Sequence, residues 1–71
     1  MKEMDLCVVM TKAEWDEVIA DGRLCSTVEK KSFSKGDVIL HDGKPYLCRC
    51  DTDIINPIGY SWVWKAIHVQ H

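Results

Sequence analysis

The dipeptide Asp42-Gly43 constrains the folding of this 71-residue chain more than any other feature. It separates two short apolar segments, and both of its residues tolerate the positive φ that a two-residue hairpin turn requires. Such a turn fixes which residues face each other across the hairpin. The predicted strands are 38–41 and 44–50, with Ile39 opposite Tyr46 and His41 opposite Lys44.

Both faces of this predicted hairpin carry apolar side chains, since successive residues of a strand point to opposite sides. A hairpin that is apolar on both sides has to be covered on both sides. One face carries Ile39, Tyr46, Cys48 and Cys50, and the other carries Val38, Leu40 and Leu47.

A short helix is predicted to follow Thr11. Thr11 and Glu14 have the spacing of a capping box, in which each side chain bonds the backbone amide of the other. Gly22 supplies the left-handed residue that commonly ends a helix. About ten residues are too few for a stable isolated helix, so it must pack on the rest of the domain. Its apolar stripe consists of Trp15, Val18 and Ile19.

The remaining elements complete an α+β fold. Residues 6–10 and 23–28 have the length and composition of strands, residues 51–60 contain the breakers of a loop (Asn56-Pro57 and Gly59), and residues 61–69 form a last strand. We expect one domain, 1–71, with a strand and helix at 6–22 and an antiparallel core at 23–69. The order β-α-β-β-β-β predicts a small, mostly antiparallel sheet or partly open barrel with one short helix packed on it.

Composition indicates a globular chain. Hydrophobic residues make up 46% and charged residues 28%, which is too apolar for disorder. There is no apolar run near 18 residues and no apolar stretch typical of a signal peptide at the start. We therefore expect no membrane partner and a protein that is cytoplasmic when made, whether or not it later joins a virion.

Charge is unevenly distributed. Residues 1–21 carry six acidic and two basic residues, whereas residues 22–49 carry six basic and three acidic ones. This asymmetry can steer a partner or a second copy of the chain, so a homo-oligomer remains an alternative. It is too weak to predict a nucleic-acid binder by itself.

The four cysteines favour packed thiols. Without a secretion signal, disulfides are not expected. Zinc needs four ligands in tetrahedral reach, and the only close pair is Cys48-x-Cys50. We expect Cys7, Cys25 and at least one of that pair to be small buried hydrophobes, with no metal and no cofactor. The chain also lacks phosphate-loop, nucleophile-elbow and metalloprotease motifs, so we do not expect an enzyme.

Aromatic residues give the stronger functional signal. Tyr60, Trp62 and Trp64 lie within five residues, next to the predicted loop. Exposed aromatic rings stack on sugar rings and make hot spots of protein interfaces. Two interpretations remain open: one tryptophan is core and the other partly exposed, or Tyr60 and one tryptophan form a binding platform. The candidate ligand-binding residues are Tyr46, Tyr60, Trp62 and Trp64.

Residues 33–64 resemble the small chitin-binding modules of chitinases and related modules of phage tail proteins. In that family an aromatic precedes Gly-Asp and a β-arm, and a Gly-Lys turn, a Tyr, a polar loop, a Pro and a Trp follow. The resemblance implies carbohydrate binding. The matching residues are Phe33, Gly36, Asp37, Ile39, Gly43, Lys44, Tyr46, Pro57 and Trp64.

Residues 6–37 are similar to the start of small PUA-like (ASCH-type) domains, which bind RNA or modified nucleosides. A helix ending in Gly22-Arg23, a strand, and then Phe33-Ser-Lys-Gly-Asp37 carry this second likeness. It implies a nucleic-acid-binding alternative that would use Arg23, Lys30, Lys31 and Lys35.

We predict a non-enzymatic binding module, encoded by a phage or prophage, that recognises a protein or glycan surface in virion assembly or host attachment. The alternatives are a PUA-like nucleic-acid-binding domain and a small phage inhibitor of a host enzyme.

Overall fold

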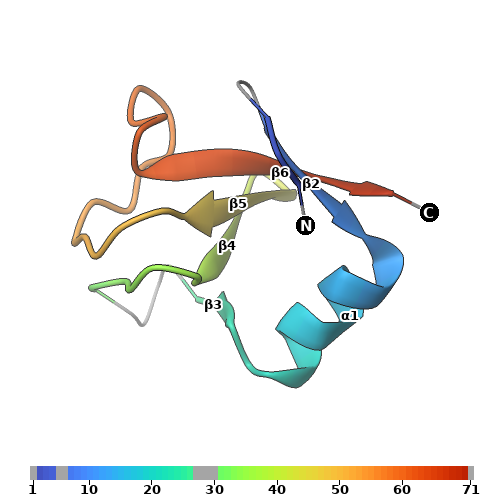
Figure 1. Ribbon diagram of the computed structural model, residues 1–71. Coiled ribbons are helices and arrows are strands. Elements are labelled where there is room, and N and C mark those ends of the chain that lie inside the picture. The colour runs from blue at the N-terminus through green and yellow to red at the C-terminus, as the bar shows by residue number, and fades with distance from the viewer. Residues whose placement is uncertain (1, 5–6, 27–30, 71) are drawn as a thin grey trace.

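The computed structural model describes residues 2–4, 7–26 and 31–70, and consists of one helix and a six-stranded sheet (Figure 1). The predicted α+β class with a single helix is confirmed. Leu6 and residues 27–30, which belong to predicted strands and their connection, lie outside the described residues. The elements are β1 (Lys2–Glu3), β2 (Cys7–Thr11), α1 (Lys12–Ala20), β3 (Leu24–Cys25), β4 (Val38–His41), β5 (Lys44–Cys48) and β6 (Trp64–Gln70).

The sheet is mixed, with the strand order β1-β2-β6-β5-β4-β3. The β1–β2, β4–β5 and β5–β6 pairs are antiparallel, whereas the β2–β6 and β3–β4 pairs are parallel. β1 and β3 form the two edges, so the sheet does not close into the partly open barrel that the sequence left as an option. The prediction of an antiparallel core over 23–69 was incomplete, because β3 runs parallel to β4 within it. In addition, β2 pairs in parallel with the distant β6.

The predicted hairpin is confirmed in both turn and register. Asp42 and Gly43 have φ values of 53° and 75°, as both central residues of a type I′ hairpin turn require. Ile39 pairs with Tyr46, and His41 pairs with Lys44.

The helix also begins as predicted. The amide of Glu14 donates to Thr11 Oγ1 over 3.2 Å, and the amide of Thr11 donates to Glu14 Oε1 over 3.0 Å. Gly22 follows the last turn with a φ of 71°. Of the predicted apolar stripe, Val18 is fully buried and Trp15 packs beside it, but Ile19 is 50% exposed. The helix therefore packs through a narrower stripe than its sequence suggested.

Each face of the sheet carries its own apolar cluster. The face under α1 is mainly aliphatic, and the other face combines aromatic rings with smaller apolar side chains. Figure 1 shows α1 at one end of the molecule and the loop between β5 and β6 at the other. The helix-side cluster contains Val8, Met10, Val18, Val38, Leu47 and Ile67, and the loop-side cluster contains Phe33, Ile39, Cys48, Val63 and Trp64.

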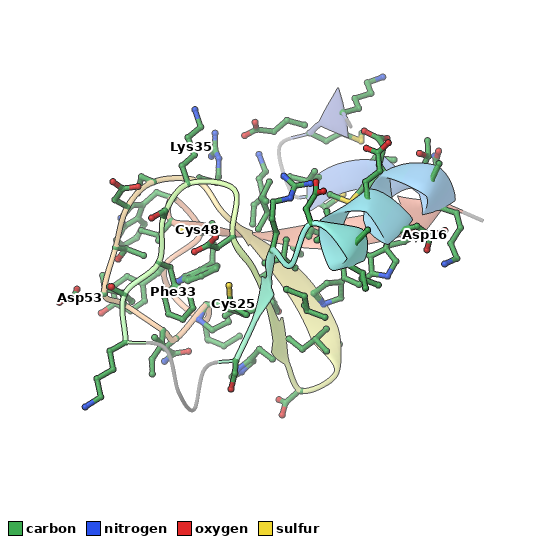
Figure 2. The ribbon with its side chains drawn as sticks, turned by 90° about the horizontal axis from the view of Figure 1, so that it is seen from below. Asp16, Cys25, Phe33, Lys35, Cys48 and Asp53 are labelled. Atoms are coloured by element: carbon green, nitrogen blue, oxygen red, sulfur yellow. The ribbon has the colours of Figure 1, made fainter. Side chains whose placement is uncertain are left out.

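The hairpin is thus covered on both sides, as its sequence predicted, although Leu40 near the turn is 47% exposed and Cys50 lies beyond β5 on the surface. Figure 2 shows Phe33, Cys25 and Cys48 gathered away from Asp16 on the helix.

Several strand boundaries differ from prediction, including that of β5, which ends at Cys48 rather than at residue 50. Within the described part of the second predicted strand, only Leu24–Cys25 is a strand, and the last strand begins at Trp64 rather than at residue 61. Lys2–Glu3 forms an edge strand that its polar sequence did not suggest. Residues 61–63 form a turn instead, which changes the expected geometry of Trp62. Within the described residues, no helix is long and apolar enough to span a membrane.

Candidate functional site

A hollow of about 420 Å³ opens beside β5, β6 and the loop that joins them. Three of the four predicted site residues line it, and the fourth, Tyr60, contacts one of these three. The lining also includes basic, hydroxyl and apolar side chains. Its residues are Tyr46, Arg49, Pro57, Ile58, Ser61, Trp62, Trp64, Lys65 and Ala66.

Trp62 is the exposed aromatic of this site. Its side chain is 62% exposed, and the edge of the neighbouring Tyr60 ring meets it at a centroid distance of 5.3 Å and an angle of 63°. Tyr60 also packs against the loop-side cluster, so it supports Trp62 from the core side. The Trp62 ring thus faces solvent, and the Tyr60 ring packs between it and the core.

Local backbone geometry explains why Trp62 stands outside the sheet. The amide of Ile58 donates to Asn56 Oδ1 over 3.0 Å, an Asx turn that follows from Asn-Pro. The carbonyl of Tyr60 then accepts from the amides of Val63 and Trp64, over 3.0 and 2.9 Å. This turn keeps residues 61–63 out of β6 and places Trp62 at the rim of the hollow.

Trp64, in contrast, is a core residue. It is 1% exposed, its Nε1 donates to the Ile54 carbonyl over 2.7 Å, and its ring meets Phe33 edge-on at 5.2 Å. It therefore lies beneath the hollow and offers no ring face to a ligand. The predicted strand over 61–69 would place Trp62 and Trp64 on the same side, but this is wrong because Trp62 precedes the strand. One tryptophan is core and the other exposed.

Tyr46 lines the hollow from the sheet side. It is half-buried, pairs with Ala66 across β5 and β6, and meets His41 edge-on at a centroid distance of 6.2 Å. Because β5 and β6 are both regular here, Tyr46 is the most firmly positioned aromatic of the site that still reaches its surface.

Two cations on the hollow, Arg49 and Lys65, were not identified from the sequence. Both pair with Glu3 of β1, Lys65 over 3.4 Å. The Lys65 side chain is only 11% exposed, whereas Arg49 is 38% exposed. Their position depends on the approach of β1 and on the β5–β6 register. No local sequence signal marks them.

None of the four thiols forms a disulfide. Cys48 is buried, as predicted for one residue of the Cys48–Cys50 pair, whereas Cys50 is exposed and Cys7 and Cys25 are only partly buried rather than buried as expected. Burial raises the pKa of the Cys48 thiol, which donates to the Cys50 carbonyl over 2.8 Å. Among the described residues, no three His, Cys, Asp or Glu side chains are grouped closely enough to hold a metal ion.

Comparison of the chain with protein-family models, with curated proteins and with solved structures finds no match.

Proposed function

We propose that this domain is a non-enzymatic binding module that holds a glycan in the hollow beside Trp62. The supporting observation is a large, solvent-facing indole at the rim of a hollow of about 420 Å³. Burying an aromatic ring in folding is favourable, so an indole that is 62% exposed retains most of its contact area for a partner.

The arrangement suits a sugar ring because it combines an apolar face with polar groups at its edge. Trp62 and Tyr46 supply aromatic surface, and Ser61, Arg49 and Lys65 supply hydrogen-bond donors. Sugar rings have the complementary division between an apolar face and peripheral hydroxyls. The resemblance of residues 33–64 to chitin-binding modules points to the same ligand class, with Trp62 taking the stacking role in place of the buried Trp64.

A protein surface is the second candidate, favoured by two further exposed side chains of the same loop. Ile55 is 45% exposed and Ile58 is 61% exposed. Together with Trp62 they form an apolar patch of the kind that anchors protein interfaces. In either case the module would serve virion assembly or host attachment, or would block a host enzyme by covering its surface.

The direct test is retention of the purified domain on immobilised chitin and on a panel of immobilised glycans. Trp62→Ala should reduce retention about tenfold or more, because a stacked aromatic contributes on the order of 1 kcal/mol beyond its buried area. Since Trp62 is largely exposed, the substitution should change the free energy of unfolding by less than about 0.5 kcal/mol.

Leu40→Ala is the matched control, because Leu40 is 47% exposed but does not line the hollow. Tyr60→Ala is a poorer probe, since Tyr60 packs on the core and its loss would also affect stability. Unchanged retention of Trp62→Ala on a glycan that the wild type binds would remove Trp62 from the site. If the wild type binds none of the glycans, but binds a protein partner that Trp62→Ala no longer binds, the second candidate is favoured.

A further inference from the structure

A second, smaller hollow of about 210 Å³ lies between β1, the turn at residues 34–37 and the end of β5. Three cations line it, Arg23, Lys35 and Arg49, with one carboxylate, Glu3. The rest of the wall is apolar or backbone and includes Leu47 and Cys48. The formal charge of this wall is therefore +2, in a chain whose net charge is −2.

Arg49 and Glu3 satisfy each other, which leaves Arg23 and Lys35 uncommitted. Among the described residues, no carboxylate forms an ion pair with either side chain. The Nε of Arg23 is buried and has no hydrogen-bond partner. A partly desolvated guanidinium with an unsatisfied N–H costs folding free energy unless an anion is bound there.

The backbone holds both cations in place. The Arg23 amide donates to the Val18 carbonyl over 3.0 Å, and its own carbonyl accepts from the Val38 amide over 2.9 Å. Lys35 is anchored by its amide, which donates to Asp51 Oδ1 over 3.1 Å. Figure 2 shows the Lys35 side chain projecting from its turn. Arg23 thus connects the end of α1 to β4, and Lys35 is fixed to the segment that follows β5.

We propose that this hollow binds a phosphate group through Arg23 and Lys35, with Arg49 completing the site. Two positive charges in excess match a phosphate dianion, and a guanidinium fork fits two phosphate oxygens at once. The carboxylates of Asp37 and Asp51 accept backbone amide protons and do not line the hollow. Their negative charges still reach Cys48 in its wall, where they help to raise the thiol pKa, so they offset part of the excess positive charge. The phosphate is either free or carried on a nucleotide.

The test is a titration of the whole protein, followed by amide chemical shifts and by calorimetry, with inorganic phosphate, adenosine monophosphate and a short single-stranded RNA. Shifts should concentrate around Arg23, Lys35 and Gly36, and the affinity should fall with added chloride. Arg23→Gln and Lys35→Gln should each weaken binding about tenfold or more, whereas Lys44→Gln, outside the hollow, should not. If adenosine monophosphate or the RNA binds much more tightly than inorganic phosphate, the bound phosphate is carried on a nucleotide. If the three affinities are equal, the ligand is free phosphate.

Two outcomes would overturn the site: no saturable shift around these residues up to about 10 mM of any of the three probes, or binding that Arg23→Gln and Lys35→Gln leave intact. Lys35 is exposed, so its substitution keeps the test valid even if Arg23→Gln lowers stability. Trp62→Ala should retain phosphate binding, which separates this site from the proposed glycan site.

Discussion

The two faces of the sheet reach similar burial by different means. Under α1, aliphatic side chains pack against a helix, whose backbone N–H and C=O groups form hydrogen bonds with one another. Under the loop, aromatic rings pack against irregular backbone that needs specific partners, such as Trp64 Nε1 for the Ile54 carbonyl and Asp51 for the Lys35 amide. Irregular cover leaves hollows and exposed rings that a helix would fill. The larger hollow and the exposed Trp62 ring therefore lie beside the loop.

The largest effect is expected at Trp64, which combines packing and hydrogen bonding on the loop face. Trp64→Ala should cost about 4 kcal/mol of unfolding free energy, from the cavity beside Phe33 and the loss of the bond to Ile54. In a domain this small, that loss should leave much of the chain unfolded in urea titrations monitored by circular dichroism.

Trp64→Phe separates the two contributions. It keeps a ring beside Phe33 but removes the donor for the Ile54 carbonyl, so its cost should be smaller, about 1–3 kcal/mol. If Trp64→Ala were as mild as an ordinary surface substitution, the contrast between the two faces would not hold.

A smaller effect is expected at the helix cap on the other face. Thr11→Ala removes the hydroxyl that accepts from the Glu14 amide and should cost about 1 kcal/mol. Thr11→Ser keeps that acceptor and should restore most of the stability in the same urea titration. A cost above that of Trp64→Phe would mean that the helix face is the more sensitive of the two.

The smallest effect on stability is expected for the thiols of the loop face. Here the measurement is the rate at which each thiol reacts with a labelling reagent. Cys50 is exposed and should react with iodoacetamide in the folded state, whereas Cys48 is buried with a raised pKa and should react only at higher pH or after unfolding. Peptide mass mapping after timed labelling distinguishes them, and Cys50→Ser should shift the unfolding free energy by less than about 0.5 kcal/mol. Equal labelling of both thiols would show that the loop face opens readily.

The same pKa shift has a defined effect on stability. The folded state favours the neutral Cys48 thiol, so its contribution is fully present below the ordinary thiol pKa of 9.0. It is lost as the pH rises through the raised folded-state pKa, because the unfolded chain gives up this proton first. The unfolding free energy of Cys48→Ala should therefore not show this loss at high pH.

Local patterns predicted the parts of the fold that local interactions determine. Asp42-Gly43 specified the hairpin register, and Thr11 with Glu14 specified the start of the helix, since both depend on residues within four positions of each other. The parallel pairing of β2 with β6 depends on residues about sixty positions apart, and no pattern in either strand identifies the other.

The candidate site was predicted in its aromatic residues but not in its geometry. Alternation along a strand over 61–69 places Trp62 and Trp64 on one side, but the bonds to the Tyr60 carbonyl hold residues 61–63 in a turn, so the strand begins only at Trp64. Only the folded turn separates the exposed indole from the buried one. Arg49 and Lys65 were missed because their shared partner, Glu3, lies on a strand that the sequence did not suggest.

The central position of β6 determines when this domain can fold during synthesis. β6 is the last strand along the described chain, yet it lies between β2 and β5 and pairs with both. A ribosome-bound chain that lacks residues 64–70 has no strand to join β2 to β5, so the short helix and the hairpin lack the sheet that stabilises them. Such long-range closure slows folding relative to locally connected domains. The nascent protein therefore remains unfolded, and open to chaperones and proteases, until Trp64–Gln70 have left the exit tunnel.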